Sequence, residues 1–314
     1  MTWPLLLSLL AAAAAAEVRP ARVHPGDAVL VTVSGAGAAP TGTLSGRPLR
    51  FWAAGPDRWQ ALGPLPVEAA AGPLPLLLEA DGAPLEAAGE VLAPAFRSST
   101  LKVPPRFLEP PASARARIAA DGAALGEAYA QPFQPPRYQG AMVRPRRAAV
   151  NGHFGDQRVY NGTVSGAHYG LDLDGAAGAP VESDADGRVV LARDCYMSGW
   201  TTIVWHGAGL YSVYMHQSKV EVRPGQEVRQ GQLIGRVGST GRSTGPHLHW
   251  GVKLDGLWVN PDSLSLLELG PPPEPPLDPQ PEPPLDPQPV PQPVPQPEPG
   301  PAPAAATAPG PAPP

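Results

Sequence analysis

Histidines and one aspartate gather in the second half of the chain at spacings that could build a metal site. Six of the seven histidines lie between residues 153 and 249. His168 and Asp172 are four residues apart, and residues i and i+4 of a β-strand point to the same face. His247 and His249 are two apart and would also share a face of a strand. Because His216 ends the strand-like segment LYSVYM, three groups could converge on one sheet.

This set of side chains suits a catalytic zinc ion. Such a site takes three nitrogen or oxygen ligands at roughly 2.0–2.2 Å and keeps one position open for water. Two imidazoles and one carboxylate would supply the ligands. The metal would lower the pKa of its water from about 15.7 toward about 7 and polarise a carbonyl group. Two histidines would remain to move protons and stabilise an oxyanion. Gly170, between His168 and Asp172, would let another group approach closely.

The same pieces also have a simpler interpretation. A single His-x₃-Asp or His-x-His is more often a surface or core pair than part of a metal site. Spacing alone therefore leaves a metal site and a set of structural side chains as open alternatives.

A longer pattern over residues 151–262 resembles the lysostaphin-type (LytM, beta-lytic) zinc metallopeptidases, a family of peptidoglycan endopeptidases. The resemblance follows the whole stretch in order and includes its glycine turns. The segments that carry it are FGDQRVYNG (154–162), SGAHYGLDL (165–173), GAPV (178–181), DGRVV (186–190), HGAGLYSVYMH (206–216), VRPGQEVRQGQLIGRVGSTGRSTGPHLHWGV (222–252) and VNP (259–261).

The resemblance implies a role for each clustered side chain. His168, Asp172 and His249 match the three zinc ligands, so one Zn²⁺ per chain is the expected cofactor. His216 and His247 match the two catalytic histidines. In the family, one of the two is taken to act as base on the zinc-bound water and both to stabilise the tetrahedral intermediate. Which of the two is the base stays open.

Other reactive or charged side chains are expected to have supporting roles. Arg158 matches an arginine near the substrate groove of the family, where it could bind substrate or form a structural salt bridge. His153 and His206 match no ligand position and are expected to be structural. The single cysteine, Cys195, excludes an intrachain disulfide and is expected to be a small buried apolar residue.

Short β-strands must position these residues, because apolar runs separated by turn residues fill the region from 150 to 265. We therefore predict an all-β fold class, with an antiparallel β-sheet zinc peptidase domain of the lysostaphin/LytM type at 138–265 and little room for helices. Its predicted strands are 187–192, 201–206, 210–215, 232–237 and 247–253.

A smaller, β-sandwich-like accessory domain is predicted for residues 17–110. Val29, Val31 and Val33 alternate within residues 27–35, which predicts a half-buried strand. An alanine-rich segment at 112–130 predicts a helix, so residues 111–137 form a helix and linker. The region also resembles, more weakly, the accessory domain of exported family members, and no cluster of ligands in it predicts chemistry. Further strands are predicted at 48–53, 58–62 and 74–79.

The start of the chain predicts export. The apolar run at 4–16 is too short for a membrane span of roughly 20 residues but has the length of a signal h-region. Three alanines precede Glu17, so residues 1–16 are predicted as a signal peptide, with a short apolar helix of the mature protein as the alternative. No cysteine follows this run, which excludes a lipid-anchored lipoprotein. The mature chain should lack a transmembrane anchor and reside in the periplasm or the extracellular cell envelope.

A proline-rich, disordered tail is predicted for residues 266–314. Of the 46 prolines, 22 lie in residues 271–314, and EPPLDPQP occurs twice in tandem, which favours an extended polyproline II spacer over a docking motif. The tail carries six acidic and no basic residues, so the net charge of −5 belongs to it. Residues 137–265 carry 13 basic and 11 acidic residues, which gives no electrostatic footprint for nucleic acid.

Together these features predict an exported zinc-dependent endopeptidase that hydrolyses peptide bonds in peptidoglycan stem or cross-bridge peptides through a zinc-activated water. The substrate class is implied by the resemblance, and both a bond next to diaminopimelate and a glycine bridge remain open. One alternative is a non-catalytic LytM-type module that binds cell-wall peptide or regulates another cell-wall hydrolase. Another is a structural envelope protein that uses the tail as a spacer.

Overall fold

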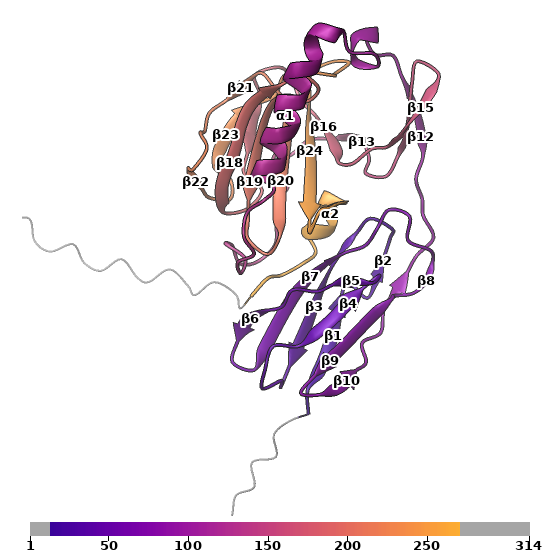
Figure 1. Cartoon of the computed structure of the whole chain (residues 1–314), viewed down its shortest axis with the longest axis vertical. Coiled ribbons are helices and arrows are strands. Elements are labelled where there is room, and N and C mark those ends of the chain that lie inside the picture. The colour runs from indigo at the N-terminus through magenta and orange to yellow at the C-terminus, as the bar shows by residue number, and fades with distance from the viewer. Residues whose placement is uncertain (1–12, 271–314) are drawn as a thin grey trace, which may run out of the picture. The chain divides into compact units, whose positions relative to one another are not determined.

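The structure is a computed structural model that describes residues 13–270 (Figure 1). The first 12 residues of the predicted signal peptide, and the predicted tail from residue 271 on, lie outside the described residues. Between residues 13 and 270 the chain is mostly β-strand, with two short 3₁₀ turns and two α-helices, which confirms the predicted all-β fold class. Neither α-helix of this range is long and apolar enough to cross a membrane.

The N-terminal part forms three small sheets. Their strands, in spatial order, are β1 (Ala15–Arg19), β3 (Ala28–Ser34), β7 (Arg58–Pro64) and β6 (Trp52–Gly55); β10 (Ala83–Leu85), β9 (Leu76–Ala80), β4 (Thr41–Leu44) and β5 (Arg47–Pro48); and β2 (Arg22–Val23), β11 (Glu90–Val91) and β8 (Gly72–Pro73). Val29 and Val31 of β3 pack in one core with Leu44 of β4 and Leu78 of β9. The first two sheets thus share an apolar interior, as a β-sandwich-like domain requires.

Two details of this part differ from the sequence-based expectation. The predicted strand at 48–53 is split, because β5 ends at Pro48 and β6 begins at Trp52 in a different sheet. The strand β3 is buried on both faces rather than one, since Leu30 also packs in a core that contains residues of the C-terminal part. The alternation of apolar residues identifies the face of β3 that packs in the interior of the sandwich. It does not show whether another part of the chain covers the opposite face.

The C-terminal part is built on an eight-stranded antiparallel sheet. Its strands, in spatial order, are β13 (Val150–Gly152), β16 (Leu171–Asp174), β24 (His247–Leu254), β20 (Leu210–Gln217), β19 (Gly199–Trp205), β18 (Gly187–Cys195) and β22 (Glu227–Val228), with β25 (Leu257–Val259) paired to β24. A second sheet contains β17 (Pro180–Glu182), β23 (Leu233–Arg236) and β21 (Lys219–Val220), and a third β12 (Ser98–Leu101), β14 (Gln157–Tyr160) and β15 (Thr163–Ala167). All five strands predicted in this region are present.

Strand β24 has two chemically different faces. Leu248, Trp250 and Val252 are completely buried in the core. His247 and His249 alternate with them and are partly exposed on the opposite face. The period of two in HLHWGV therefore gives the sheet one apolar face and one face that carries the histidines.

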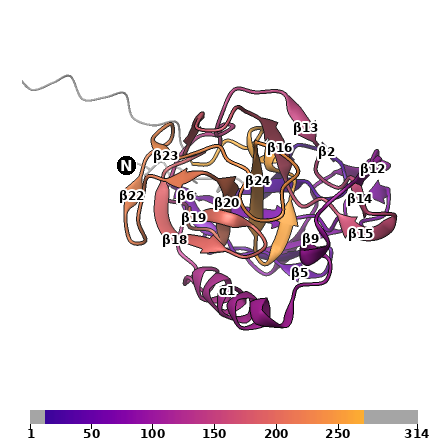
Figure 2. The same cartoon turned by 90° about the horizontal axis from the view of Figure 1, so that it is seen from above.

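The predicted helix at 112–130 is confirmed as α1 (Arg115–Ala128), which follows the 3₁₀ turns η1 (Pro105–Phe107) and η2 (Ala112–Ala114). The helix lies against the sheet beside β18, β19 and β20 in both views (Figures 1 and 2). Leu125 and Ala128 pack against Ile203 and Val213 there. Buried Asp121 connects the helix to the end of β18, because it accepts hydrogen bonds from the Arg193 side chain (2.7 Å) and the Tyr196 backbone N–H (2.8 Å).

The short helix α2 (Pro261–Leu264) joins the two β-rich parts. Asn260 Nδ2 donates a hydrogen bond to Asp27 Oδ1 (2.9 Å), and the Ala28 N–H donates to Ser263 Oγ (3.0 Å). Leu264 packs in the core that also contains Leu30. Two parts that the sequence predicts as separate domains thus share an apolar core and polar contacts.

Candidate active site

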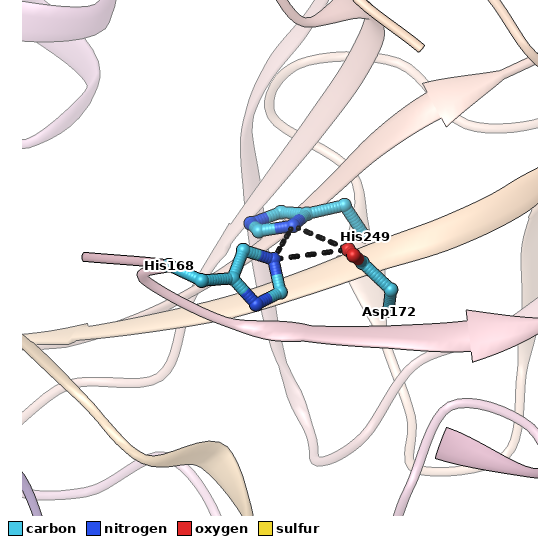
Figure 3. Close-up of side chains that lie close together, drawn as sticks. All are labelled: His168, Asp172 and His249. Atoms are coloured by element: carbon cyan, nitrogen blue, oxygen red, sulfur yellow. Dashed lines mark hydrogen bonds and ion pairs between the residues drawn. The ribbon is translucent and has the colours of Figure 1, made fainter. Parts of the chain in front are cut away.

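Three of the predicted site residues form a compact triangle of ligand atoms (Figure 3). His168 Nε2, Asp172 Oδ1 and His249 Nδ1 lie 3.0 Å from one another along all three edges. Asp172 on β16 and His249 on β24 are direct partners in the antiparallel ladder, which aims their side chains to the same point. Among the described residues these three side chains form a group that could hold a metal ion.

His168 reaches the triangle from a break between strands. It lies after β15 and before β16, so the prediction that His168 and Asp172 share one continuous strand is wrong. The His168 N–H donates to the Asp156 carbonyl, and the His168 carbonyl accepts from the Gly155 N–H, both at 2.8 Å. The chain turns at residues 168–170, and this turn rather than strand periodicity brings the two ligands together.

Gly170 makes the close approach possible, as the sequence predicts. A Cβ atom at this position would lie 2.6 Å from His249 Nε2 and 2.7 Å from the Trp250 carbonyl oxygen. The second of these atoms belongs to the backbone and cannot move aside. Any larger residue would therefore push β24 and its ligand away from the triangle.

The hydrogen-bond chemistry of the triangle fits a cation. His168 Nδ1 lies 2.9 Å from the His153 carbonyl oxygen, and because a carbonyl can only accept, this nitrogen carries the proton. The Nε2 atom of a neutral His168 then presents a lone pair to a carboxylate oxygen 3.0 Å away. A proton on His249 Nδ1 would then be the only one available for hydrogen bonds along the three edges of the triangle. A metal ion removes this conflict, since each of the three atoms can direct a lone pair to it.

Arg158 forms an ion pair with the second oxygen of the carboxylate. Its Nη2 atom donates to Asp172 Oδ2 at 2.7 Å, and its side chain is almost entirely buried. Gly152 makes room for this pair, because a Cβ there would lie 2.3 Å from the guanidinium and 2.4 Å from the carboxylate. Of the two roles left open for Arg158, the salt bridge is present, and the residue also lines the cavity described below.

The two other predicted residues, His216 and His247, lie beside the triangle with their rings oriented by one loop. His216 Nδ1 donates to the Thr240 carbonyl (2.8 Å), and His247 Nδ1 donates to the Gly245 carbonyl (2.9 Å). The two ring centroids are 4.9 Å apart. Both histidines therefore carry the proton on Nδ1 and have Nε2 free to accept one, and His247 Nε2 lies 3.6 Å from Asp172 Oδ1.

His216 adopts an unusual backbone conformation near the end of β20. Its φ of +61° is in the left-handed region, which non-glycine residues rarely adopt. The ladder between β19 and β20 shifts register at this point, between Trp200 and Thr202. The irregularity turns the His216 side chain out of the regular alternation, and such backbone strain concentrates at functional sites.

Burial and mutual contacts control the charge of these groups. Burial alone would raise the pKa of Asp172, but its contacts with His168 and His249 hold the pKa well below its usual range. Burial lowers the pKa of His249. Burial, together with His247 and His249, lowers the pKa of His216 to about 3. At neutral pH Asp172 is thus a carboxylate, and His249 and His216 are neutral imidazoles; a carboxylate and a neutral imidazole are the forms that bind metal.

The remaining predicted residues lie outside this cluster. His206 is fully buried, with Nδ1 2.8 Å from the Asp186 carbonyl and Nε2 2.9 Å from Ser212 Oγ, so its contacts are structural as expected. His153 contributes its backbone carbonyl to His168 rather than its ring. Cys195 is a buried free cysteine, as predicted.

The triangle and both neighbouring histidines line a cavity of about 680 Å³, a size typical of ligand pockets. Part of its wall comes from segments for which the sequence predicts no function: Leu101 of β12, and Leu125 and Tyr129 at the end of α1. Strand β12 reaches the site because it pairs in parallel with β14, which carries Arg158. These contacts join residues far apart in the chain, so no local pattern could have revealed them.

Comparison with known proteins gives one match within the C-terminal part and another that is longer. The profile of peptidase family M23 matches residues 166–261. In a crystal structure from Pseudomonas aeruginosa assigned to peptidase M23, the similar region is 30% identical and covers 77% of this chain and 94% of that chain, with a TM-score of 0.54. This likeness extends over both β-rich parts.

Among characterised proteins, the chain is similar to the peptidoglycan DD-endopeptidase ShyA of Vibrio cholerae, with 38% identity over 112 residues, 35% of this chain. It is also similar to the DD-carboxypeptidase/endopeptidase Mpg of Neisseria meningitidis, with 40% identity over 99 residues, 32% of this chain. The match spans only 26% and 23% of the length of these two relatives.

Proposed function

The chain belongs to peptidase family M23, and from this we propose that it is an exported zinc-dependent endopeptidase that hydrolyses peptide bonds in peptidoglycan stem or cross-bridge peptides. The observation that carries the proposal is the ligand triangle with two further histidines beside it in one cavity. A structural histidine cluster would not need two additional imidazoles that both keep Nε2 free.

In this proposal His168, Asp172 and His249 hold one Zn²⁺ per chain. When bound, the ion would act as a Lewis acid on the scissile carbonyl and lower the pKa of a water molecule. Three equal edges of 3.0 Å and a donor set of two imidazoles and one carboxylate support this assignment. Arg158 would hold Asp172 in its orientation through Asp172 Oδ2.

His216 and His247 are the proposed catalytic residues. The loop carbonyls hold both rings with Nδ1 protonated, so each Nε2 can accept a proton or, once protonated, donate one. One ring would take the proton of the attacking water and pass it to the leaving amine. The protonated ring would also stabilise the negative charge that develops on the carbonyl oxygen. The geometry supports either order of the two residues.

The substrate class and the location rest on other observations. The name of the Vibrio cholerae relative supports peptidoglycan as substrate, and the triangle lines a cavity whose size is typical of ligand pockets. The apolar run at 4–16 followed by Glu17 supports export to the periplasm or the cell envelope.

The experiment that tests the proposal compares zinc content and muropeptide release from purified sacculi for the wild type, His249→Ala and His247→Ala. His249→Ala should lose both zinc and release, because it removes a ligand. His247→Ala should keep zinc and lose at least about 100-fold in rate, because it removes only a proton-transfer group. Equal loss of zinc in both variants would contradict the ligand assignment. Full zinc occupancy without release from any wall chemistry would favour the non-catalytic binding or regulatory module instead.

A further inference from the structure

The wall of the active-site cavity contains a guanidinium group that the proposed chemistry does not use. Arg242 lines the cavity and is partly exposed, and its Cζ atom lies 4.8 Å from the centre of the Tyr160 ring, which supports it by a cation–π contact. Among the residues that the structure describes, no acidic side chain forms a salt bridge with Arg242.

The charge balance of the cavity makes this group distinctive. Its lining contains one acidic residue, Asp172, whose outer oxygen is bound by Arg158. The charges of Asp172 and Arg158 therefore cancel, and the remaining lining, apart from the histidines, is uncharged. Arg242 is thus the single permanently charged group of this lining that is left to meet a substrate.

The backbone of Arg242 is held in place as well as its side chain. Its N–H donates to the Met197 carbonyl at 2.7 Å. Its neighbour Gly241 packs so tightly against the turn before β19 that a Cβ would lie 2.3 Å from the Gly199 nitrogen. The loop therefore presents the guanidinium from a fixed point, and the same loop orients His216 through the Thr240 carbonyl. A group bound by Arg242 would be positioned relative to the catalytic histidines.

We propose that Arg242 is a specificity-determining residue that binds a free carboxylate of the peptide substrate. This inference rests on the proposed peptidase function and narrows its substrate to acidic peptides. A planar guanidinium can bind a carboxylate with two parallel hydrogen bonds, whereas a carboxamide or a glycine bridge offers it no charged partner. Stem peptides with free diaminopimelate carboxylates would therefore be preferred over their amidated forms and over neutral bridges.

The test uses two cross-linked muropeptides that differ only in whether the diaminopimelate carboxylates are free or amidated. The zinc-loaded wild type should cleave the free form with a kcat/KM higher by roughly ten- to hundred-fold, the range expected for a hydrogen bond to a charged group. In Arg242→Gln this ratio should fall to near one, mainly through KM. Arg242→Lys should keep part of the preference, because it retains the charge but not the planar fork. Zinc content and melting temperature should stay at wild-type values in both.

A matched control removes the same charge elsewhere. Arg223→Gln changes an exposed arginine that lies outside the cavity lining, so it should keep the wild-type ratio. Tyr160→Leu, which removes the ring under the guanidinium, should reduce the ratio, and Tyr160→Phe should preserve it. This pair separates the effect of Arg242 placement from a general loss of positive charge.

The outcomes distinguish the two proposals. If the wild type cleaves both muropeptides equally well, or if Arg242→Gln keeps the wild-type preference, the role of Arg242 is wrong while the peptidase function stands. If the wild type cleaves neither, the peptidase function fails. Equilibrium binding of the two muropeptides to the zinc-loaded protein then tests whether Arg242 binds the free carboxylate. Tighter binding of the free form that is lost in Arg242→Gln supports the role, and equal or absent binding overturns it.

Discussion

The protonation state of His216 follows from its surroundings rather than from its place in the sequence. The side chain is about 8% exposed, and burial together with His247 and His249 lowers its pKa to about 3. In an unfolded chain the same ring would titrate near about 6.5. Folding therefore excludes a proton from this ring, and the site keeps a neutral base well below neutral pH.

This difference predicts how the stability of the metal-free protein depends on pH. The unfolded state binds a proton at His216 below about pH 6.5, and the folded state does so only near pH 3. The free energy of unfolding should thus be fully retained above pH 6.5 and fall by up to about 1.4 kcal/mol per pH unit between pH 6.5 and 4.5 for this group. Urea unfolding in the presence of a chelator measures it.

A variant isolates the contribution of the group. His216→Gln cannot titrate, so its stability curve should be flatter than that of the wild type over the same range. The pKa of Asp172 is lowered, so this carboxylate loses its stabilising effect only as pH falls below about 3.9 and does not act in this window. Parallel curves for the two proteins would contradict the buried neutral state of His216.

The residues that carry chemistry could be predicted because their types are rare and their spacing is short. Asp172 and His249 needed only strand periodicity and the resemblance to be placed together. Gly152 and Arg242 could not be found in this way, because the role of each depends on a residue that another segment brings near. The first makes room for Arg158, and the second stands over Tyr160.

Strand β24 carries two of the five site residues, and its position is fixed from the opposite face of the sheet. Trp250, adjacent to His249, donates its indole N–H to Asp184 Oδ2 at 2.7 Å. Ser212 of β20 donates to the same oxygen at 2.5 Å. Asp184 is completely buried, so this carboxylate connects β24 and β20 inside the core.

Removal of this connection should destabilise the sheet. Asp184→Ala would leave the Trp250 N–H without its acceptor in the core and would break the bond that joins Ser212 to the same oxygen, which is expected to lower the free energy of unfolding by about 2–4 kcal/mol. Glu182→Ala, an exposed acid two residues away, should change it by less than about 0.5 kcal/mol. Denaturant unfolding of the zinc-loaded proteins distinguishes the two, and equal values would show that Asp184 does not support the core.

Helices and strands could be predicted where a local sequence pattern defines them. Contacts between segments far apart in the chain could not be predicted. The alternation in HLHWGV identified β24, and the alanine-rich segment identified α1. The same reasoning could not show that α1 covers the face that carries His249, or that β12 pairs in parallel with β14. The segment 48–53 has the composition of one strand, yet the chain crosses there from one sheet to another.

At the scale of the whole molecule, the end of the described chain belongs to the folded core. Leu267 and Leu269 are almost completely buried in the core shared by both β-rich parts. Leu269 and Gly140 exchange two backbone hydrogen bonds of 3.0 Å, and the Gly270 N–H donates to Gln60 Oε1 at 2.8 Å. The predicted boundary at residue 266 therefore cuts through contacts that hold the two parts together.

Two truncations test where the folded unit ends. Removal of residues 271–314 eliminates only the proline-rich sequence, so zinc content, melting temperature and muropeptide release in solution should equal those of the full chain. Truncation after Leu264 also removes Leu267 and Leu269, each worth about 1.5–3 kcal/mol of burial. It should lower the melting temperature by at least about 6 °C. If the first truncation lost zinc, the tail would be part of the peptidase unit. If the two truncated proteins had the same melting temperature, residues 265–270 would not contribute to the core. The shared core could then not be what couples the N-terminal sandwich to the sheet that carries the site.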